Sequence, residues 1–308
     1  MKTIYNYLKT YLSDNFSLPL YAGLTIWLTI LFAFNYSCDF EDSYVDRIRN
    51  FPLRFLAHFL LMFIPFIGAC FLIHYFKEIK FLREREFWIK ILIGFGVLAF
   101  YRSAYFQRFF CDLIDMKACT FLYKVVIKFF RLAMLLLPLL IFYRRDKDQM
   151  VGFYGLTFIP KHLKIYLPAL GIMAVVIFLS TFLPSIQKFY PMYFKSGGMA
   201  FAKYNHWPDW AVISAFEISY LSNFISVEFF FRGFLIFSFV RFFGPQVVLP
   251  AVCCYAVLHF GKPFVEAFSS IFGGYILSIL ALKTKNIWGG IFLHVGIAGM
   301  MELFTWLT

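Results

Sequence analysis

The chain has 308 residues, of which 61% are hydrophobic and only 15% are charged, and it contains 45 Phe. Apolar runs long enough to span a bilayer recur from Leu18 to the C-terminus, which is typical of a polytopic membrane protein and excludes a soluble globular domain. The formal net charge of +12 does not indicate nucleic-acid binding, because Lys and Arg gather between apolar runs, where they report topology and contact with anionic lipid.

The apolar runs predict an all-α bundle of about eight or nine transmembrane spans. The first run, Leu18 to Phe34, follows Lys2 and Lys9 as in a signal peptide, but it is long and lacks a small-residue cleavage site. We therefore expect an uncleaved first span. The predicted spans are 17–36, 54–76, 87–104, 129–143, 165–185, 210–240, 247–260, 264–282 and 287–307.

Basic loops predict the topology. The segments Lys77–Lys90 and Arg144–Lys164 are rich in Lys and Arg, so the positive-inside rule places both in the cytoplasm. Counting spans from these loops places the N-terminus, Arg241 and the turn Lys283–Lys285 on the same side. The acidic stretch Asp39–Asp42 then lies outside.

Three basic residues do not fit this scheme well. Lys124, Lys128 and Arg131 fall at the outer end of the fourth predicted span. An interfacial amphipathic helix is the alternative, and it would change the span count by one.

The six Cys include no CxxC pair, which excludes a zinc ribbon or a redox motif of that kind. Cys38, Cys111 and Cys119 fall on the predicted outer side, where a disulfide is permitted. Free thiols are the expectation.

The polar connection Arg144–Lys164 divides the chain. It predicts an N-terminal group of transmembrane helices, 1–145, and a C-terminal core, 146–308. Within the core, the run 210–240 is too long for a ~30 Å hydrocarbon layer at ~1.5 Å per residue, so it must tilt, break or protrude. Gly233, Gly244 and Pro245 are its predicted weak points.

Two opposite charges lie inside this long apolar run. Glu228 and Arg232 are four residues apart, so they share one helix face and can form an ion pair. A charge at mid-bilayer costs about 2.5 to 3.5 kcal/mol, so a retained pair faces the protein interior and marks either a structural pin or a functional site.

Four His lie in or beside predicted spans. His58 and His74 have no polar companion on their helix faces, and we expect each to hydrogen-bond a neighbouring helix. His259 and His294 differ, because Tyr255 lies one turn before the first and Gly289-Gly290 shortly before the second. Glycines allow another helix to approach closely.

A carboxylate and two His from three helices are the minimum set that activates a water molecule, by general base or through a bound metal. No HExxH helix is present, which excludes the common zinc-protease arrangement. From spacing alone, a hydrolytic site and a structural polar cluster both remain open.

These residues resemble the CPBP family of intramembrane proteases, also called Abi, which includes the type II CAAX prenyl endopeptidases. The family signature is EExxxR on one helix, FxxxH on the next, and HxxxN or HxxxD on a later one. Glu228 to Arg232 matches the first motif from its second Glu, Tyr255 to His259 matches the second with Tyr for Phe, and His294 opens the third. Order and spacing agree over about residues 150–308.

Two positions depart from the family pattern. The first Glu, which the family is taken to use for activating water, is Val227, and the Asn or Asp of the third motif is Ala298. Glu228 matches the Arg partner, about 100° round the helix from the catalytic position. Glu302, eight residues after His294, is a candidate to replace the missing polar group in part.

The resemblance implies a CPBP-family intramembrane endopeptidase of CAAX type, of metallo or glutamic type, that is active, weakened or a pseudoenzyme. Its implied site comprises catalytic Glu228, His259 and His294, the Glu228–Arg232 pair and supporting Tyr255 and Glu302. The two His are the candidate ligands of Zn²⁺ or another divalent metal, or no metal is bound.

The implied partners are membrane lipids and a membrane-embedded or prenylated peptide, with no nucleic acid. The implied location is a bacterial inner membrane, with the N-terminus in the cytoplasm. A non-catalytic relative acting as a bacteriocin-immunity or membrane-binding protein is the alternative, and a small transporter is the second.

Overall fold

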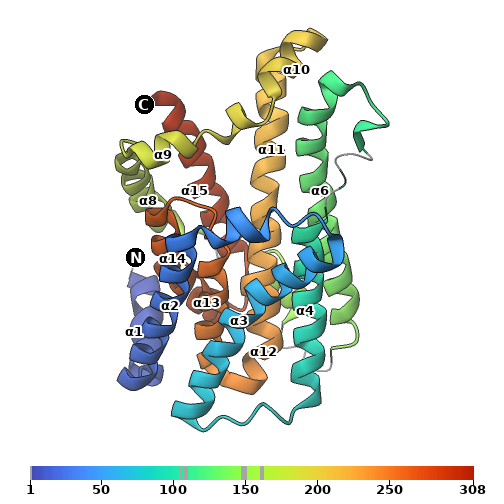
Figure 1. Ribbon diagram of the computed structural model, residues 1–308. Coiled ribbons are helices and arrows are strands. Elements are labelled where there is room, and N and C mark those ends of the chain that lie inside the picture. The colour runs from blue at the N-terminus through green and yellow to red at the C-terminus, as the bar shows by residue number, and fades with distance from the viewer. Residues whose placement is uncertain (1, 105, 107–109, 147–150, 160–162) are drawn as a thin grey trace.

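A computed structural model describes residues 2–104, 106, 110–146, 151–159 and 163–308, and within them every regular element is helical. The long helices form an upright bundle, with the N-terminal helices at one side (Figure 1). The α-helices are α1 (Lys2–Asn15), α2 (Leu18–Cys38), α3 (Phe51–Lys77), α4 (Arg85–Ser103), α6 (Met116–Tyr143), α8 (Leu167–Ser180), α9 (Pro184–Phe189), α10 (Gly198–Asn205), α11 (Asp209–Glu228), α12 (Leu235–Phe243), α13 (Val248–Val257), α14 (Phe264–Thr284) and α15 (Trp288–Leu307). Short π or 3-10 turns are η1 (Glu41–Val45), η2 (Gly152–Gly155), η3 (Met192–Lys195), η4 (Phe229–Phe234) and η5 (Gly244–Val247).

The predicted all-α membrane bundle is confirmed. Among the described residues six helices are long and apolar enough to cross a membrane, or seven if α8 and the segment Pro184–Asn205, bent by 90°, form one span. The predicted eight or nine agree approximately with this number. The continuous segment Asp209–Val257 counts once although it contains two predicted spans, and α4 carries too many charges to be among the six.

The long apolar run 210–240 becomes irregular at the glycines that were predicted to be its weak points. Helix α11 continues without a gap through the π-helical η4, which contains Gly233, into α12. The chain turns back at Gly244, whose φ of 56° is the left-handed conformation that glycine adopts without strain. The three helices α11, α12 and α13 thus form the centre of the bundle, and most residues from Phe229 to Val257 are buried.

Ion pairs bring the basic connections to one end of the bundle. Arg241 pairs with Glu86 at 2.8 Å, and buried Lys90 pairs with Asp146 at 2.9 Å. Tyr11 of α1 donates a hydrogen bond to the Pro245 carbonyl at the same end. The segments predicted to share one side of the membrane therefore lie together, while Lys147 and Lys161 of the predicted basic loop lie outside the described residues.

The opposite end holds the acidic stretch. The Tyr36 hydroxyl donates to the Lys262 carbonyl at 3.0 Å, so the loop after α2 meets the turn between α13 and α14. Arg102 of α4 pairs there with Glu41. Burial raises the pKa of the Glu41 carboxyl, against the opposing effect of Arg102.

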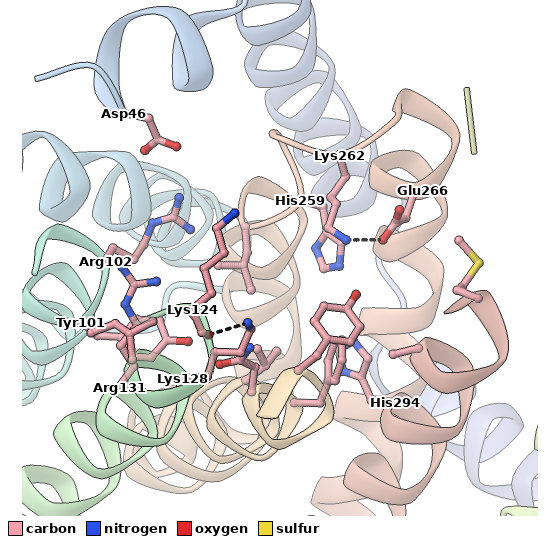
Figure 2. A pocket seen from close by; sticks show the side chains of 18 of the residues that line it. Asp46, Tyr101, Arg102, Lys124, Lys128, Arg131, His259, Lys262, Glu266 and His294 are labelled. Atoms are coloured by element: carbon pink, nitrogen blue, oxygen red, sulfur yellow. Dashed lines mark hydrogen bonds and ion pairs between the residues drawn. The ribbon is translucent and has the colours of Figure 1, made fainter. Parts of the chain in front are cut away.

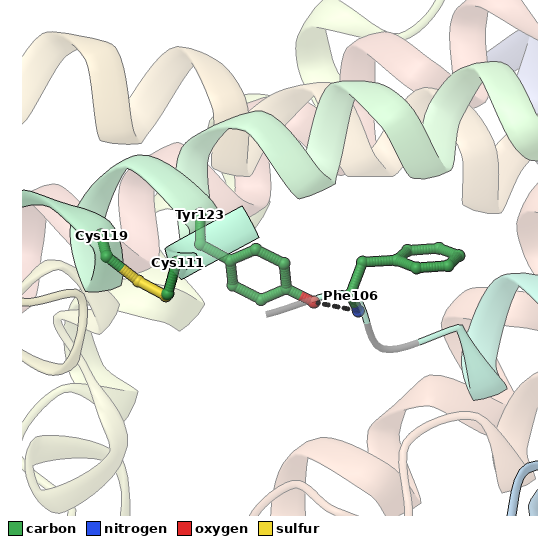
Figure 3. The surroundings of a disulfide bond; sticks show 4 residues. All are labelled: Phe106, Cys111, Cys119 and Tyr123. Atoms are coloured by element: carbon green, nitrogen blue, oxygen red, sulfur yellow. Dashed lines mark hydrogen bonds between the residues drawn. A yellow bond between two sulfur atoms is a disulfide. The ribbon is translucent and has the colours of Figure 1, made fainter. Parts of the chain in front are cut away.

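One expectation about the cysteines is wrong. Cys111 and Cys119 form a disulfide at the start of α6, with their Cα atoms 5.2 Å apart, instead of remaining free thiols. Figure 3 shows the bond beside Tyr123, whose hydroxyl accepts a hydrogen bond from the Phe106 amide. Cys38 is free and exposed, as expected.

Candidate active site

The charge pair of the central helix is fully buried. Arg232 Nη1 lies 3.0 Å from Glu228 Oε1, and neither side chain is more than 1% exposed. The Arg232 guanidinium carbon also lies 3.9 Å from the centre of the Tyr255 ring, which attracts it through the ring quadrupole. The predicted pair therefore forms, and it connects the central helix to α13.

His294 hydrogen-bonds directly to this pair. Its Nδ1 lies 2.9 Å from Glu228 Oε1, so the carboxylate accepts and Nδ1 carries the hydrogen. The imidazole therefore presents Nε2, which has no partner among the described residues, as its proton acceptor. A carboxylate in this position fixes the tautomer and the orientation of the ring.

A backbone carbonyl fixes His259 in the same tautomer as His294, with the hydrogen on Nδ1. His259 lies just beyond the end of α13, and its Nδ1 is 3.0 Å from the Tyr255 carbonyl, one turn earlier. A carbonyl can only accept, so Nδ1 donates and Nε2 is again the acceptor. The Tyr255 ring packs edge-on against His259, with centroids 4.6 Å apart, and lies 6.2 Å from the ring of His294. Tyr255 thus lies between the two histidines and the arginine.

Glycines allow this close approach. A Cβ built on Gly290 would overlap Glu228 Oε2, and one on Gly274 would lie 2.7 Å from the Tyr255 ring. Real Cβ contacts do not reach such values, so α15 approaches the central helix and α14 approaches α13 only because these residues lack side chains. This bears out the expectation for the Gly289-Gly290 pair.

A polar cavity of about 550 Å³ opens beside the two histidines. His259 and His294 both line it, as do Val227 and Ala298, the two positions that depart from the family motif. Glu228 does not line it. Position 227, where the family motif has its first Glu, therefore lies at the cavity wall. Glu228 lies outside the cavity and orients His294 through the hydrogen bond to Nδ1.

Of the other carboxylates in this part of the protein, Glu302 and Glu217 lie outside the cavity, whereas Glu266 lies at its wall. Both oxygens of Glu302 lie 2.9 Å from the Met192 amide, and the residue does not line the cavity. Glu217 lies beside Glu302 and does not line the cavity either. Glu266 does line it, 3.3 Å from Lys262 Nζ (Figure 2). Its carboxylate also accepts a hydrogen bond from the Tyr190 hydroxyl.

The donor set does not match a three-ligand metal site. Among the described residues no three His, Cys, Asp or Glu side chains are grouped as metal ligands. Glu228 Oε1, the carboxylate oxygen nearest to His294, is already shared with Arg232. Binding of a divalent metal by His259 and His294 stays a prediction, and no chemical step below depends on it.

Sequence reasoning missed one wall of the cavity. Lys124, Lys128 and Arg131 point into it from α6, which is a single helix and neither a short span from residue 129 nor a separate interfacial helix. Their spacing of four and three residues on one helix face was the available signal. Asn223, one turn before Val227, also lines the cavity and was not singled out.

The other two histidines have structural partners. His74 Nδ1 lies 2.7 Å from the Ile79 carbonyl at the end of α3. His58 accepts a hydrogen bond from Arg102 Nε at 3.2 Å, as expected for a contact with a neighbouring helix, but it also lines the cavity.

Comparisons with known proteins agree with the motif. Residues 208–300 match the family model described as type II CAAX prenyl endopeptidase Rce1-like. No curated protein and no solved structure matches the chain. The matched segment contains Val227, Glu228, Arg232, His259 and His294. Residues 208–300 of this integral membrane protein are thus similar to the Rce1-like type II CAAX prenyl endopeptidases, in agreement with the CPBP resemblance.

Proposed function

We propose that the chain is a weakened CAAX-type intramembrane endopeptidase in which His294 is the general base. The observation that carries the proposal is the hydrogen bond from His294 Nδ1 to the buried Glu228 carboxylate, with the other ring nitrogen left at a polar cavity. An imidazole held by a carboxylate can accept a proton from water where valine cannot.

The reaction follows from the orientation of the two rings. A water molecule beside Nε2 of His294 and His259 loses a proton to His294 as its oxygen attacks the peptide carbonyl carbon. The negative charge on the carbonyl oxygen is stabilised by donors at the cavity wall, with the Asn223 amide on the nearest turn of α11. His294 then returns the proton to the leaving amine, and the products are a carboxylate and an amine.

The rate is expected to be low. The family pattern places a carboxylate where Val227 lies, and a positioned general base contributes about 10²- to 10⁴-fold to a hydrolysis rate. Arg232 also shares the Glu228 oxygen that holds His294, which weakens the support that this carboxylate gives to the imidazolium.

A non-catalytic relative is the second candidate, in which the same cavity binds a membrane peptide or acts in immunity without cleaving it. The observation that favours it is the apolar character of both Val227 and Ala298 at the cavity wall.

The chain is an integral membrane protein, and its family implies a peptide substrate in a lipid environment. We place it in a bacterial inner membrane with the end that contains Arg241 and the N-terminus in the cytoplasm, and its substrate is a prenylated or membrane-embedded peptide. Labelling of introduced cysteines from either side of sealed vesicles tests the orientation.

The test of function is cleavage of matched farnesylated and unprenylated CAAX peptides by the purified full chain in lipid nanodiscs, with products identified by mass spectrometry. The wild type should cleave slowly, and His294→Ala should abolish cleavage. Val227→Glu should raise the rate about 10²-fold or more, and the isosteric control Val227→Gln should not. Peptide binding without cleavage by the wild type and by Val227→Glu would instead assign the chain to the non-catalytic alternative.

A further inference from the structure

The cavity wall opposite the two histidines is positively charged. Figure 2 shows Arg102, Lys124, Lys128 and Arg131 on one side of the pocket, with His259 and His294 on the other. We call the set formed by Arg54, Arg102, Lys124, Lys128 and Arg131 the cationic wall; it comes from α3, α4 and α6.

Within the described part of the chain, three of these cations have no carboxylate within 4.0 Å. Lys128 Nζ donates to the Lys124 carbonyl at 2.7 Å and lies 4.5 Å from the centre of the Phe216 ring. Arg131 donates to the Ala104 carbonyl at 3.2 Å, and its buried Nε has no hydrogen-bond partner. Lys124 Nζ donates to the Lys195 carbonyl.

Carboxylates near the wall are fewer than its cations. Glu41 pairs with Arg102, and Asp46 lines the cavity 3.6 Å from His58. Of the side chains that line the cavity, six are positive, with Lys262 as the sixth, and two are negative, Asp46 and Glu266; Glu217 and Glu302 act on Lys128 from outside the cavity. Charges removed from bulk water are expensive unless an opposite charge compensates them, so this arrangement favours an anion in the cavity.

We propose that the cationic wall is a binding site for a phosphate-bearing ligand. Arg131 offers planar donors that suit a phosphate, and the two lysines add point charges beside it. The stripe from Lys124 to Arg131 rises about 10 Å along α6, longer than one carboxylate needs. A diphosphate or a phosphate with a second anionic group matches this length and the charge excess better than a single carboxylate does.

The phosphate has two possible carriers, a lipid headgroup or a free anion from solution. The site does not depend on peptide hydrolysis, because none of its residues contacts Glu228 or is needed to orient the two histidines. Ligand binding is therefore measured without turnover. Its result tests the phosphate site independently of the proposed peptidase activity.

The experiment uses the full chain purified in phosphate-free detergent solution, with thermal unfolding recorded against ligand concentration. One arm titrates pyrophosphate, with chloride at equal ionic strength as the control. The other titrates short-chain phosphatidic acid, with the matching diacylglycerol as the control. The test variant is Lys128→Gln with Arg131→Gln. The charge-matched control is Lys203→Gln with Arg85→Gln, because both of these residues are exposed and lie outside the cavity.

Saturable stabilisation by pyrophosphate, by phosphatidic acid or by both supports the site. Binding of phosphatidic acid alone identifies a lipid as the carrier, and equal binding of pyrophosphate identifies a soluble anion. The test variant should bind at least about tenfold more weakly than the wild type, while the control variant is unchanged. If the test variant does not fold, Lys124→Gln alone should give a severalfold loss. No stabilisation by either ligand, or equal losses in test and control variants, overturns the proposal.

Discussion

Breaking the ion pair between Glu228 and Arg232 should destabilise the protein strongly. Arg232→Met keeps most of the side-chain volume but leaves a carboxylate that is 0% exposed without its main counter-charge. Breaking a buried pair by removing one partner costs about 3–5 kcal/mol. The lost stacking on Tyr255, at 3.9 Å, adds up to about 2 kcal/mol for a desolvated cation, which places the expected cost in the upper part of that range.

The free energy of unfolding is measured by titration with SDS in mixed micelles, followed by far-UV circular dichroism. Glu228→Gln should cost about as much as Arg232→Met, and the double variant should cost about 3 kcal/mol less than the sum of the two. The matched control is Arg241→Met, nine residues later in the same continuous helix. Arg241 is 33% exposed beside Glu86, so its removal should cost less than about 1 kcal/mol. Strict additivity of the two central substitutions, or an equal cost for Arg241→Met, would refute the reasoning.

Three further predictions concern the site and the cysteines. Gly290→Ala should lower both stability and any peptidase activity because its methyl group overlaps Glu228, whereas Gly273→Ala, with open space around it, should be neutral in the same assays. A chelator should leave the rate of peptide cleavage unchanged, because the proposed reaction uses His294 as the base and none of its steps uses a metal; loss of activity that Zn²⁺ restores would contradict that mechanism and support a metal on His259 and His294. A membrane-impermeant maleimide should label Cys38 directly but Cys111 only after reduction, and labelling of Cys111 without reduction would contradict the disulfide.

The transmembrane helices were predictable because a bilayer demands about 20 apolar residues per span, and that demand is visible in any window of the sequence. The breaks and bends within these helices were harder to predict from the sequence. Helix α8 ends at Ser180 and the chain then bends by 90°, within what the sequence presented as one apolar run to residue 185. Hydropathy measures the partition of side chains into lipid, and it carries no information about the direction of the chain.

The site was predictable only where motif residues carry it. Glu228, Arg232, His259 and His294 were found from spacing and resemblance, but helix geometry predicted only the Glu228–Arg232 pair and not the hydrogen bonds of the two histidines. The cationic wall was not found, because Arg102 and Arg131 lie on other helices far from the motif in the chain. Basic residues in an apolar run lower its hydropathy in the same way whether they face lipid headgroups or a cavity, so the run appeared to begin at residue 129 and not at Met116.

The π-helical stretch Phe229–Phe234 sets the rotation between the two halves of the longest helix. Each residue of an α-helix turns the chain by about 100°, and a π-turn accommodates one residue more than an α-turn without a break in the helix. Deleting one residue from this stretch would let it close into a regular α-helix, and deleting Phe230 would also remove a fully buried side chain from the core. The stretch therefore behaves as a one-residue insertion on which the surrounding core depends, and because all of its residues are buried it should tolerate few substitutions.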